Sequence, residues 1–199
     1  MQSDNTMPKV KAPVSDHVDS PFYAVLDAVV RELGDPALCG DQRCNPAIQR
    51  VIDAEARLLD THQYQAWLDL FTDDCVYWMP STWPAASSAR TIALEFHDRR
   101  RLLDRIARID TQAAYSQIPR SRTARVLGAS AVVEGGSLRD GVLVRNSFLL
   151  SEFRGEHLRV LSGWYGYWIR EQQGQPKIAL KLINLLDCDH PQGNNSFFI

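Results

Sequence analysis

Apolar residues recur at helical spacing through the first half of the chain. One stripe predicts a helix with Ser20 as its N-cap, Pro21 at its first position and Gly34 at its end. Its core positions are Phe22, Val25, Leu26, Val29, Val30 and Leu33. A second stripe, after Asn45 and Pro46, consists of Ile48, Val51, Ile52, Ala56 and Leu59. Residues 36–45 between the two predict a linker.

The pattern then alternates between helical and extended segments. A third helix places Tyr64, Trp67, Leu68 and Phe71 on one face, and Val76–Met79 predicts a strand that Pro80 ends. After a loop over residues 81–89, a helix that starts near His97 and Asp98 has Leu102, Ile106 and Ile109 as core positions. Asp73 and Asp74 fall between the third helix and the strand, which predicts a solvated turn.

Long extended runs dominate the second half of the chain. Val142–Arg154 and His157–Glu171 predict an antiparallel hairpin, because Gly155 can supply the positive φ of a two-residue turn. In Lys177–Asp187, the residues Ile178, Leu180 and Leu182 alternate with Lys177, Ala179 and Lys181. Such alternation is typical of a half-exposed strand.

Helices followed by long antiparallel strands indicate an α+β fold. We expect a cone of the NTF2-like or ketosteroid-isomerase-like kind, in which a curved, mostly antiparallel sheet wraps around the helices. The predicted division is an arm, extra helix and linker over residues 1–44, with an arm up to about residue 19, and the cone domain over residues 45–199.

Composition and charge exclude several classes of protein. The net charge of -2 argues against a nucleic-acid partner. No apolar run approaches the roughly 20 residues of a membrane span, and the first residues lack the apolar core of a signal peptide. The four cysteines fit reduced thiols. We expect a cytoplasmic protein without membrane contact.

The inventory of metal ligands is poor. A Rieske centre needs two Cys and two His, but Cys188 to His190 is the one Cys-x-His fragment, and Cys39 and Cys44 have no His nearby. A mononuclear iron site needs two His and a carboxylate on one face. The five histidines are widely separated: His17, His62, His97, His157 and His190. We predict no metal-ligating or cofactor-binding residue in this chain.

A cone can nevertheless hold an active site. In ketosteroid-isomerase-like proteins an acid and a tyrosine lie inside the cone, and the candidates here are Asp53, Tyr64, Asp110 and Tyr115. The alternative is structural: two surface acids, a packed tyrosine and a loop anchor. We predict no catalytic residue. A stand-alone isomerase, cyclase or dehydratase acting on a small hydrophobic substrate stays the alternative, and a binding or scaffold protein is a third hypothesis.

Four blocks of sequence resemble the small (β) subunit of bacterial Rieske-type aromatic-ring-hydroxylating dioxygenases. The first runs from Glu55 to Pro80 (EARLLD-x6-WLDLFTDD-x2-YWMP), and the second combines DRIARID with PRSRTARVL. The third is the hairpin Ser147–Glu171, and the fourth combines KIALKLINLLD with the final NNSFFI. The resemblance covers about residues 45–199. The longer lead-in, a weak match over Trp83–Phe96 and the GWYGYW run depart from it.

The resemblance implies a structural subunit of an oligomeric terminal oxygenase in aromatic catabolism. The large α subunit would hold a Rieske [2Fe-2S] cluster and a mononuclear Fe(II), and electrons would come from NADH through a reductase and often a ferredoxin. The implied assembly is α3β3, in which this chain would contact α and other β subunits and have no activity by itself.

Three features predict contacts with neighbouring subunits. Arg101, Arg105 and Arg108 share a helix face, which is either a solvated charged face or a contact for carboxylates of a neighbouring subunit, and Asp104 can support Arg108. The aromatic run from Trp164 to Trp168 alternates faces, so one side fills the cone and the other needs a partner. The apolar residues Phe197–Ile199 should be buried in their own domain or in a neighbour.

Overall fold

The computed structural model describes residues 18–85, 87–134 and 140–199. His17 and most of the predicted arm therefore lie outside the described residues.

Four α-helices and two short 3-10 helices occur in the described part. The α-helices are α1 (Ser20–Gly34), α2 (Pro46–Asp60), α3 (Tyr64–Leu68) and α4 (Arg99–Asp110). The 3-10 helices are η1 (Pro36–Leu38) and η2 (Tyr115–Gln117). Asn45 caps α2 as predicted, since its side chain accepts from the Ala47 N–H at 2.8 Å. The cap of α1 is Asp19, one residue before the predicted Ser20, because its carboxylate accepts from the Phe22 N–H.

One curved sheet contains eight strands of the described residues. They are β1 (Cys39–Arg43), β2 (Phe71–Pro80), β3 (Ala93–Asp98), β4 (Arg122–Leu127), β5 (Ala131–Val133), β6 (Val142–Arg154), β7 (His157–Gln172) and β8 (Gln175–Leu185). The order is β1-β5-β6-β7-β8-β2-β3, and β4 pairs with β6. The β2–β8 pair is parallel and the other pairs are antiparallel. The predicted α+β cone is confirmed.

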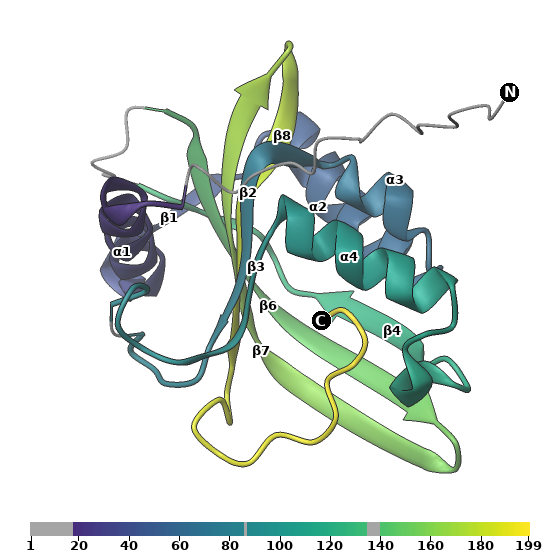
Figure 1. The fold of residues 1–199 in the computed structure, drawn as a ribbon. Helices are drawn as coiled ribbons and strands as arrows, with labels where there is room; N and C mark the ends of the chain where they lie inside the picture. Colours follow the sequence, from purple (N-terminus) through teal and green to yellow (C-terminus); the bar gives the residue numbers. More distant parts are fainter. Residues whose placement is uncertain (1–17, 86, 135–139) are drawn as a thin grey trace, which may run out of the picture.

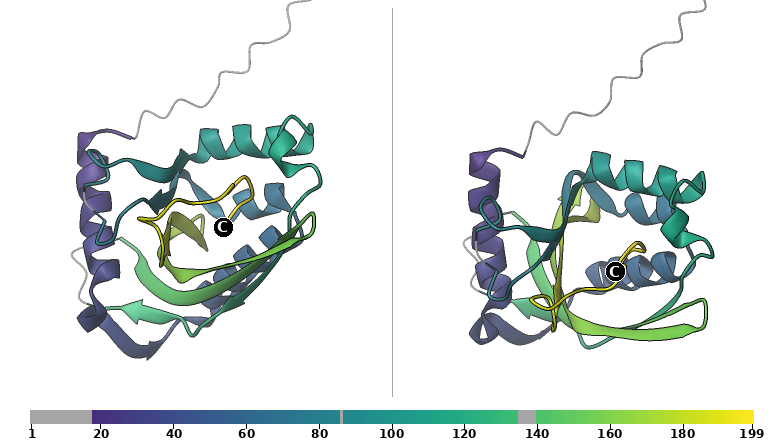
Figure 2. Two further views of the ribbon diagram at one scale, coloured as in Figure 1. Left: turned by 90° about the horizontal axis from the view of Figure 1, so that it is seen from below. Right: turned by 60° about the horizontal axis from the view of Figure 1, so that its bottom comes forward.

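Helices cover the sheet on both sides. Figure 1 shows α2, α3 and α4 on the concave side of the sheet and α1 on the opposite side. Two hydrophobic clusters follow from this arrangement: one inside the cone, with Trp67 and Tyr165, and one under α1, with Leu26 and Trp164. Figure 2 shows the C-terminal end inside the curve of the sheet.

The side of β7 that faces away from the cone is covered by α1. Trp164 and Trp168 are 6% and 7% exposed and pack in the cluster that contains Leu33 of α1. Gly166 lies between them, where an added Cβ would come within 2.8 Å of a methyl group of Leu33. The prediction that this side needs a partner subunit was therefore wrong, because the chain's own extra helix buries it. The prediction that the other side fills the cone is confirmed, since Tyr165 is fully buried there.

Two strands were missed in the sequence. The predicted linker contains η1 and β1, and β1 pairs with β5 from a distant part of the chain. Strand β3 pairs with β2, so His97 lies in a strand and Asp98 caps α4. The division at residues 44 and 45 stays a prediction, although α1 contacts β6 and β7 of the same sheet.

Strand β2 begins five residues earlier than expected. Phe71, assigned to the third helix, is its first residue, and Asp73 and Asp74 lie within it rather than in a turn. The predicted alternation in β8 was also wrong, because every residue from Ile178 to Leu185 is buried. Since α1 covers one face of the sheet and the cone covers the other, β8 has no exposed face.

Candidate functional site

The four residues proposed for an isomerase-like site do not form one. Asp53 is exposed on α2 and accepts from Gln49, while Asp110 is exposed and lies 3.7 Å from Arg120. Tyr115 is 83% exposed, and Tyr64 alone faces the cone. No hydrogen bond within the described part of the chain joins any two of these four candidates.

A buried ion pair lies inside the cone instead. Glu55 of α2 and Lys181 of β8 are both fully buried, and the Lys181 ammonium donates to Glu55 Oε1 at 2.6 Å. The Trp67 indole N–H donates to the same oxygen at 2.8 Å, and the Tyr167 hydroxyl donates to Oε2 at 3.4 Å. Burial lowers the pKa of Lys181 to about 8, although the neighbouring Glu55 favours its charged form.

Neither member of this pair was recognised in the sequence. Glu55 lies within the apolar stripe of α2, three residues after Ile52 and four before Leu59. Lys181 lies in the otherwise apolar run from Ile178 to Ile183. Two opposite charges at core positions were the available signal, because a buried charge needs a partner.

The interior of the cone is filled by the end of the chain as described. Phe197, Phe198 and Ile199 are at most 2% exposed and belong to the cone cluster. Lys181 donates to the main-chain oxygen of Ile199 at 2.8 Å, and the Tyr77 hydroxyl lies 3.0 Å from the Ile199 nitrogen. The sequence left open whether this segment is buried in its own domain or in a neighbouring subunit. The structure shows that it packs in its own domain.

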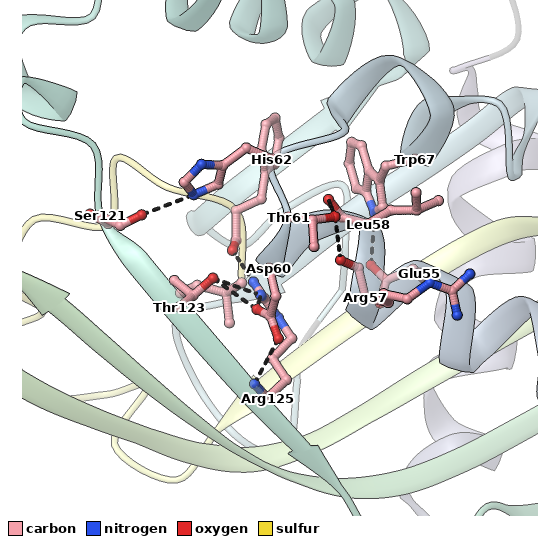
Figure 3. Close-up of polar contacts among 12 residues, drawn as sticks. Glu55, Arg57, Leu58, Asp60, Thr61, His62, Trp67, Ser121, Thr123 and Arg125 are labelled. Atoms are coloured by element: carbon pink, nitrogen blue, oxygen red, sulfur yellow. Dashed lines mark hydrogen bonds and ion pairs between the residues drawn. The ribbon is translucent and has the colours of Figure 1, made fainter.

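A second charged pair joins α2 to β4. Figure 3 shows Asp60 of α2 facing Thr123 and Arg125 of β4. One oxygen of Asp60 accepts from the Thr123 hydroxyl at 2.8 Å, and the other accepts from the Arg125 main-chain N–H at 2.8 Å. The same figure shows Glu55 facing Trp67. These contacts hold α2 against the sheet and leave no free carboxylate at either position.

Arg105 is not a surface residue. Its guanidinium donates to Glu95 of β3 at 2.5 Å and to the Phe197 oxygen at 2.7 Å. The predicted three-arginine surface was therefore wrong at Arg105, whereas Arg101 and Arg108 are exposed.

Asp104 pairs with Arg100, at 3.6 Å, rather than supporting Arg108. Because the pair is exposed, it contributes little to stability.

His97 lies beside Arg105. Burial, together with the positive charges of Arg105 and Arg101, lowers the pKa of His97 to about 4. Its ring lies 3.7 Å from Glu95, whose own pKa is raised by burial against the opposing effect of Arg105. His97 is therefore neutral near pH 7.

The paired acids of β2 form structural contacts. Asp74 is bonded to Arg170 of β7, and these bonds hold the pKa of Asp74 below its usual value although burial acts in the opposite direction. Asp73 accepts from Gln172 at 3.1 Å. Both acids thus connect β2 to the last residues of β7, across the intervening strand β8.

The histidines and cysteines of the described residues do not converge. Cys188 is buried, while His190 is exposed and bonded to Asp189. His62 contacts the Ser121 main-chain oxygen at 3.0 Å. Within residues 18–85, 87–134 and 140–199, no three His, Cys, Asp or Glu side chains group as metal ligands. The donor set does not fit a Rieske centre or a mononuclear iron, and the absence of a metal from this chain stays a prediction.

Comparison with known proteins identifies the family. Residues 54–190 match the family model described as the ring hydroxylating beta subunit. The chain belongs to this family. The predicted resemblance to dioxygenase β subunits is therefore confirmed, and the family match includes α2 from Ala54 onward, the hairpin β6–β7 and strand β8.

Individual relatives agree with the family match. The chain is 29% identical over 155 residues to the small oxygenase component of the p-cumate 2,3-dioxygenase system of Pseudomonas putida, covering 76% of this chain and 85% of that protein. The β subunit of benzoate 1,2-dioxygenase from Burkholderia mallei superposes with a TM-score of 0.61 at 26% identity, covering 80% of this chain and all of that one. A naphthalene 1,2-dioxygenase structure shares the fold, with a TM-score of 0.67 at 15% identity over 92% of this chain and 96% of that chain.

No helix in the described residues has the length and apolar character needed to span a membrane.

Proposed function

We propose that this β subunit works by assembly, as the structural component of a terminal oxygenase whose large α subunit carries the chemistry. The observation that carries the proposal is the filled cone: Phe197–Ile199 occupy the space in which a cone-fold enzyme would bind its substrate. The ligand inventory supports the same division of labour, because the described residues of this chain do not gather a metal site.

The cofactors and electron carriers then belong to the other components. The α subunit holds a Rieske [2Fe-2S] cluster and a mononuclear Fe(II), and NADH supplies electrons through a reductase, with a ferredoxin between them where one is present. This chain has no activity by itself, and it assembles in the cytoplasm as α3β3 with contacts to α and to other β subunits. The free state of all four cysteines is consistent with a reducing compartment.

The isomerase hypothesis loses its support. An enzyme of that kind needs an acid or base facing an accessible cone, but Asp53, Asp110 and Tyr115 are exposed on the outer surface. The buried acid, Glu55, is engaged by Lys181 and by two further donors.

An apolar patch on the outer face of the sheet is available for assembly. It lies beyond the region that α1 covers and consists of Val126, Leu149, Leu158, Val160 and Leu186, which are 49–74% exposed. Val126 pairs with Leu149, and Val160 lies diagonally across from Leu149 on the paired strand. Clustered exposed apolar residues mark interaction sites, and we assign this patch to contact with the large subunit.

A second surface includes Arg108 of α4. A cavity of about 560 Å³ between β3, α4 and the final segment is lined by Arg108 and Tyr115, among others. Arg and Tyr are enriched at interface cores. We retain the proposal that arginines of this helix bind carboxylates of a neighbouring subunit, now restricted to Arg101 and Arg108.

Co-expression with the large oxygenase chain tests the proposal. The double variant Leu149→Glu, Val160→Glu should fold but fail to co-purify with the large subunit, because it places two charges in the patch. The matched control is Ile92→Glu, since Ile92 is 85% exposed and lies outside the patch. Complex formation by the double variant would overturn the assignment of the patch. Catalytic turnover by the wild-type chain alone would overturn the proposed function.

A further inference from the structure

Residues 194–199, the final segment, are held by side chains rather than by a main-chain ladder. The segment belongs to no helix or strand. Arg105 donates to the Asn195 and Phe197 oxygens at 3.0 and 2.7 Å, Arg125 donates to the Phe198 oxygen, and Lys181 donates to the Ile199 oxygen at 2.8 Å. Arg159 of β7 also donates to the Asn194 oxygen at 3.2 Å, so four cationic groups, from α4, β4, β7 and β8, bind its main-chain oxygens.

The ring of Phe198 occupies an aromatic pocket. The rings of Trp67, Tyr64 and Tyr77 lie 4.7, 5.3 and 6.1 Å from it, measured between centroids. The Arg105 guanidinium lies 4.3 Å from the same centroid, which adds a cation–π contact. This pocket is built from α3, α4 and β2, so it recognises one aromatic side chain from several directions.

Polar contacts continue along the segment toward its exposed start. Arg159 of β7 donates to Asn195 Oδ1 at 3.0 Å, and its guanidinium lies 5.5 Å from the Phe197 ring. Gln117 of η2 donates to the Ser196 hydroxyl at 2.7 Å. The contacts therefore specify both the path of the main chain and the positions of two aromatic side chains.

Buried main-chain oxygens need donors in any segment, but here the donors are charged side chains rather than the main-chain N–H groups of a neighbouring strand. Charge-assisted bonds are strong in a water-excluded site, and main-chain hydrogen bonds combined with side-chain pockets are the means by which proteins bind peptides. We propose that the cone is a peptide-binding site, specific for an extended segment of the form Asn-Ser-Phe-Phe-Ile, which its own residues 195–199 occupy and which the same peptide can occupy in trans.

The floor of this site is the Glu55–Lys181 pair. Glu55 orients the Lys181 ammonium, which also binds the Ile199 oxygen, so the pair has a binding role in addition to a structural one. A ligand without an oxygen at this place would leave a donor direction of a buried ammonium unpaired. The site thus selects an acyl oxygen at its floor and an aromatic ring in the Phe198 pocket.

Cleavage of the folded full-length chain tests the proposal. A specific protease site is introduced in the largely exposed stretch at residues 191–194, the protein is cleaved after folding, and the released segment is removed by dialysis. A fluorescent Asn-Ser-Phe-Phe-Ile peptide should then bind saturably. The matched Asn-Ser-Phe-Ala-Ile peptide should bind at least roughly tenfold more weakly, because it loses the ring that fills the pocket.

Two results would overturn the proposal: a cleaved, natively folded protein that binds neither peptide, or equal affinity for both. If cleavage unfolds the chain, the uncleaved Phe198→Ala variant replaces it. Its melting temperature, or its folded fraction, should rise with added Asn-Ser-Phe-Phe-Ile and not with the alanine peptide. The absence of any rise with the former peptide would equally refute the site.

Discussion

Replacing Lys181 by Met should destabilise the protein more than most single substitutions do. The methionine fills a similar volume but leaves the Glu55 carboxylate buried without its ammonium partner. Breaking a buried pair in this way costs about 3–5 kcal/mol, a large part of the roughly 5–15 kcal/mol that stabilises a typical domain. Equilibrium unfolding in urea, followed by tryptophan fluorescence, measures the change.

The double variant Glu55→Gln, Lys181→Met is the control. It removes both charges, and the side-chain oxygen of the new glutamine can still accept from the Trp67 indole. Its loss of stability should be about 2 kcal/mol or less, because no uncompensated charge remains. A Lys181→Met protein within about 1 kcal/mol of the parent, or a double variant as unstable as the single one, would refute the argument.

The same pair predicts a pH dependence. Because the pKa of Lys181 is lowered to about 8 in the folded chain, the unfolded chain binds more protons between about pH 8 and 10.5. The neutral amine, unlike a methionine, can still donate to Glu55 and to the Ile199 oxygen, so its deprotonation does not leave the carboxylate without a donor. This contribution to the free energy of unfolding should therefore rise by about 2 kcal/mol from about pH 7.5 to 9.5, at roughly 1.36 kcal/mol per pKa unit. The double variant lacks the titrating group, so a rise of equal size in it would contradict the assignment.

Two further predictions concern other parts of the cone. His97→Gln should reduce the loss of stability between about pH 6.5 and 4 by about 2 kcal/mol, because the folded His97 takes up its proton later than the unfolded one; the exposed His157→Gln is the control, and urea unfolding at about pH 7 and 4.5 decides. Gly166→Ala should cost about 1–3 kcal/mol by overpacking against Leu33, and the added substitution Leu33→Ala should recover part of it; an unchanged melting temperature for Gly166→Ala would show that α1 does not pack there.

The hairpin could be predicted from the sequence because its signals are local. The cone could be predicted because several blocks of sequence together resemble a known family. Strands β6 and β7 are long, extended and joined by two residues, and Gly155 adopts the expected positive φ of 61°. The helix caps at Asn45 and near Ser20 are equally local. The resemblance to β subunits added the cone, which no single segment specifies.

The missed elements depend on contacts between distant residues. Strand β1 is short and polar, and it exists because β5 offers a partner far along the chain, a separation that is visible in the pairing of Cys39 with Val133. The alternation of residue types in β8 is typical of a strand with one exposed face, so the sequence predicted that Lys181 points toward solvent. The partner of Lys181, Glu55, is 126 positions away, so burial of the pair follows from the topology alone.

The assignment of surfaces failed for the same reason. The aromatic run of β7 has two apolar faces, and the sequence does not say that α1 covers the outer one. Arg105 has the spacing of a surface residue on α4, but the final segment folds back over it. In both cases the chain supplies the partner that a second subunit was expected to supply.

The metal content and mass of the purified protein, measured with and without its large subunit, separate a structural subunit from a catalytic one. We expect no bound iron and no oxygen uptake for this chain alone. Co-expression with the large oxygenase chain should give a mixed complex of both chains that contains iron. Stoichiometric iron in the isolated chain, or a large subunit that assembles fully without this chain, would show that it is not the structural, metal-free component of the complex.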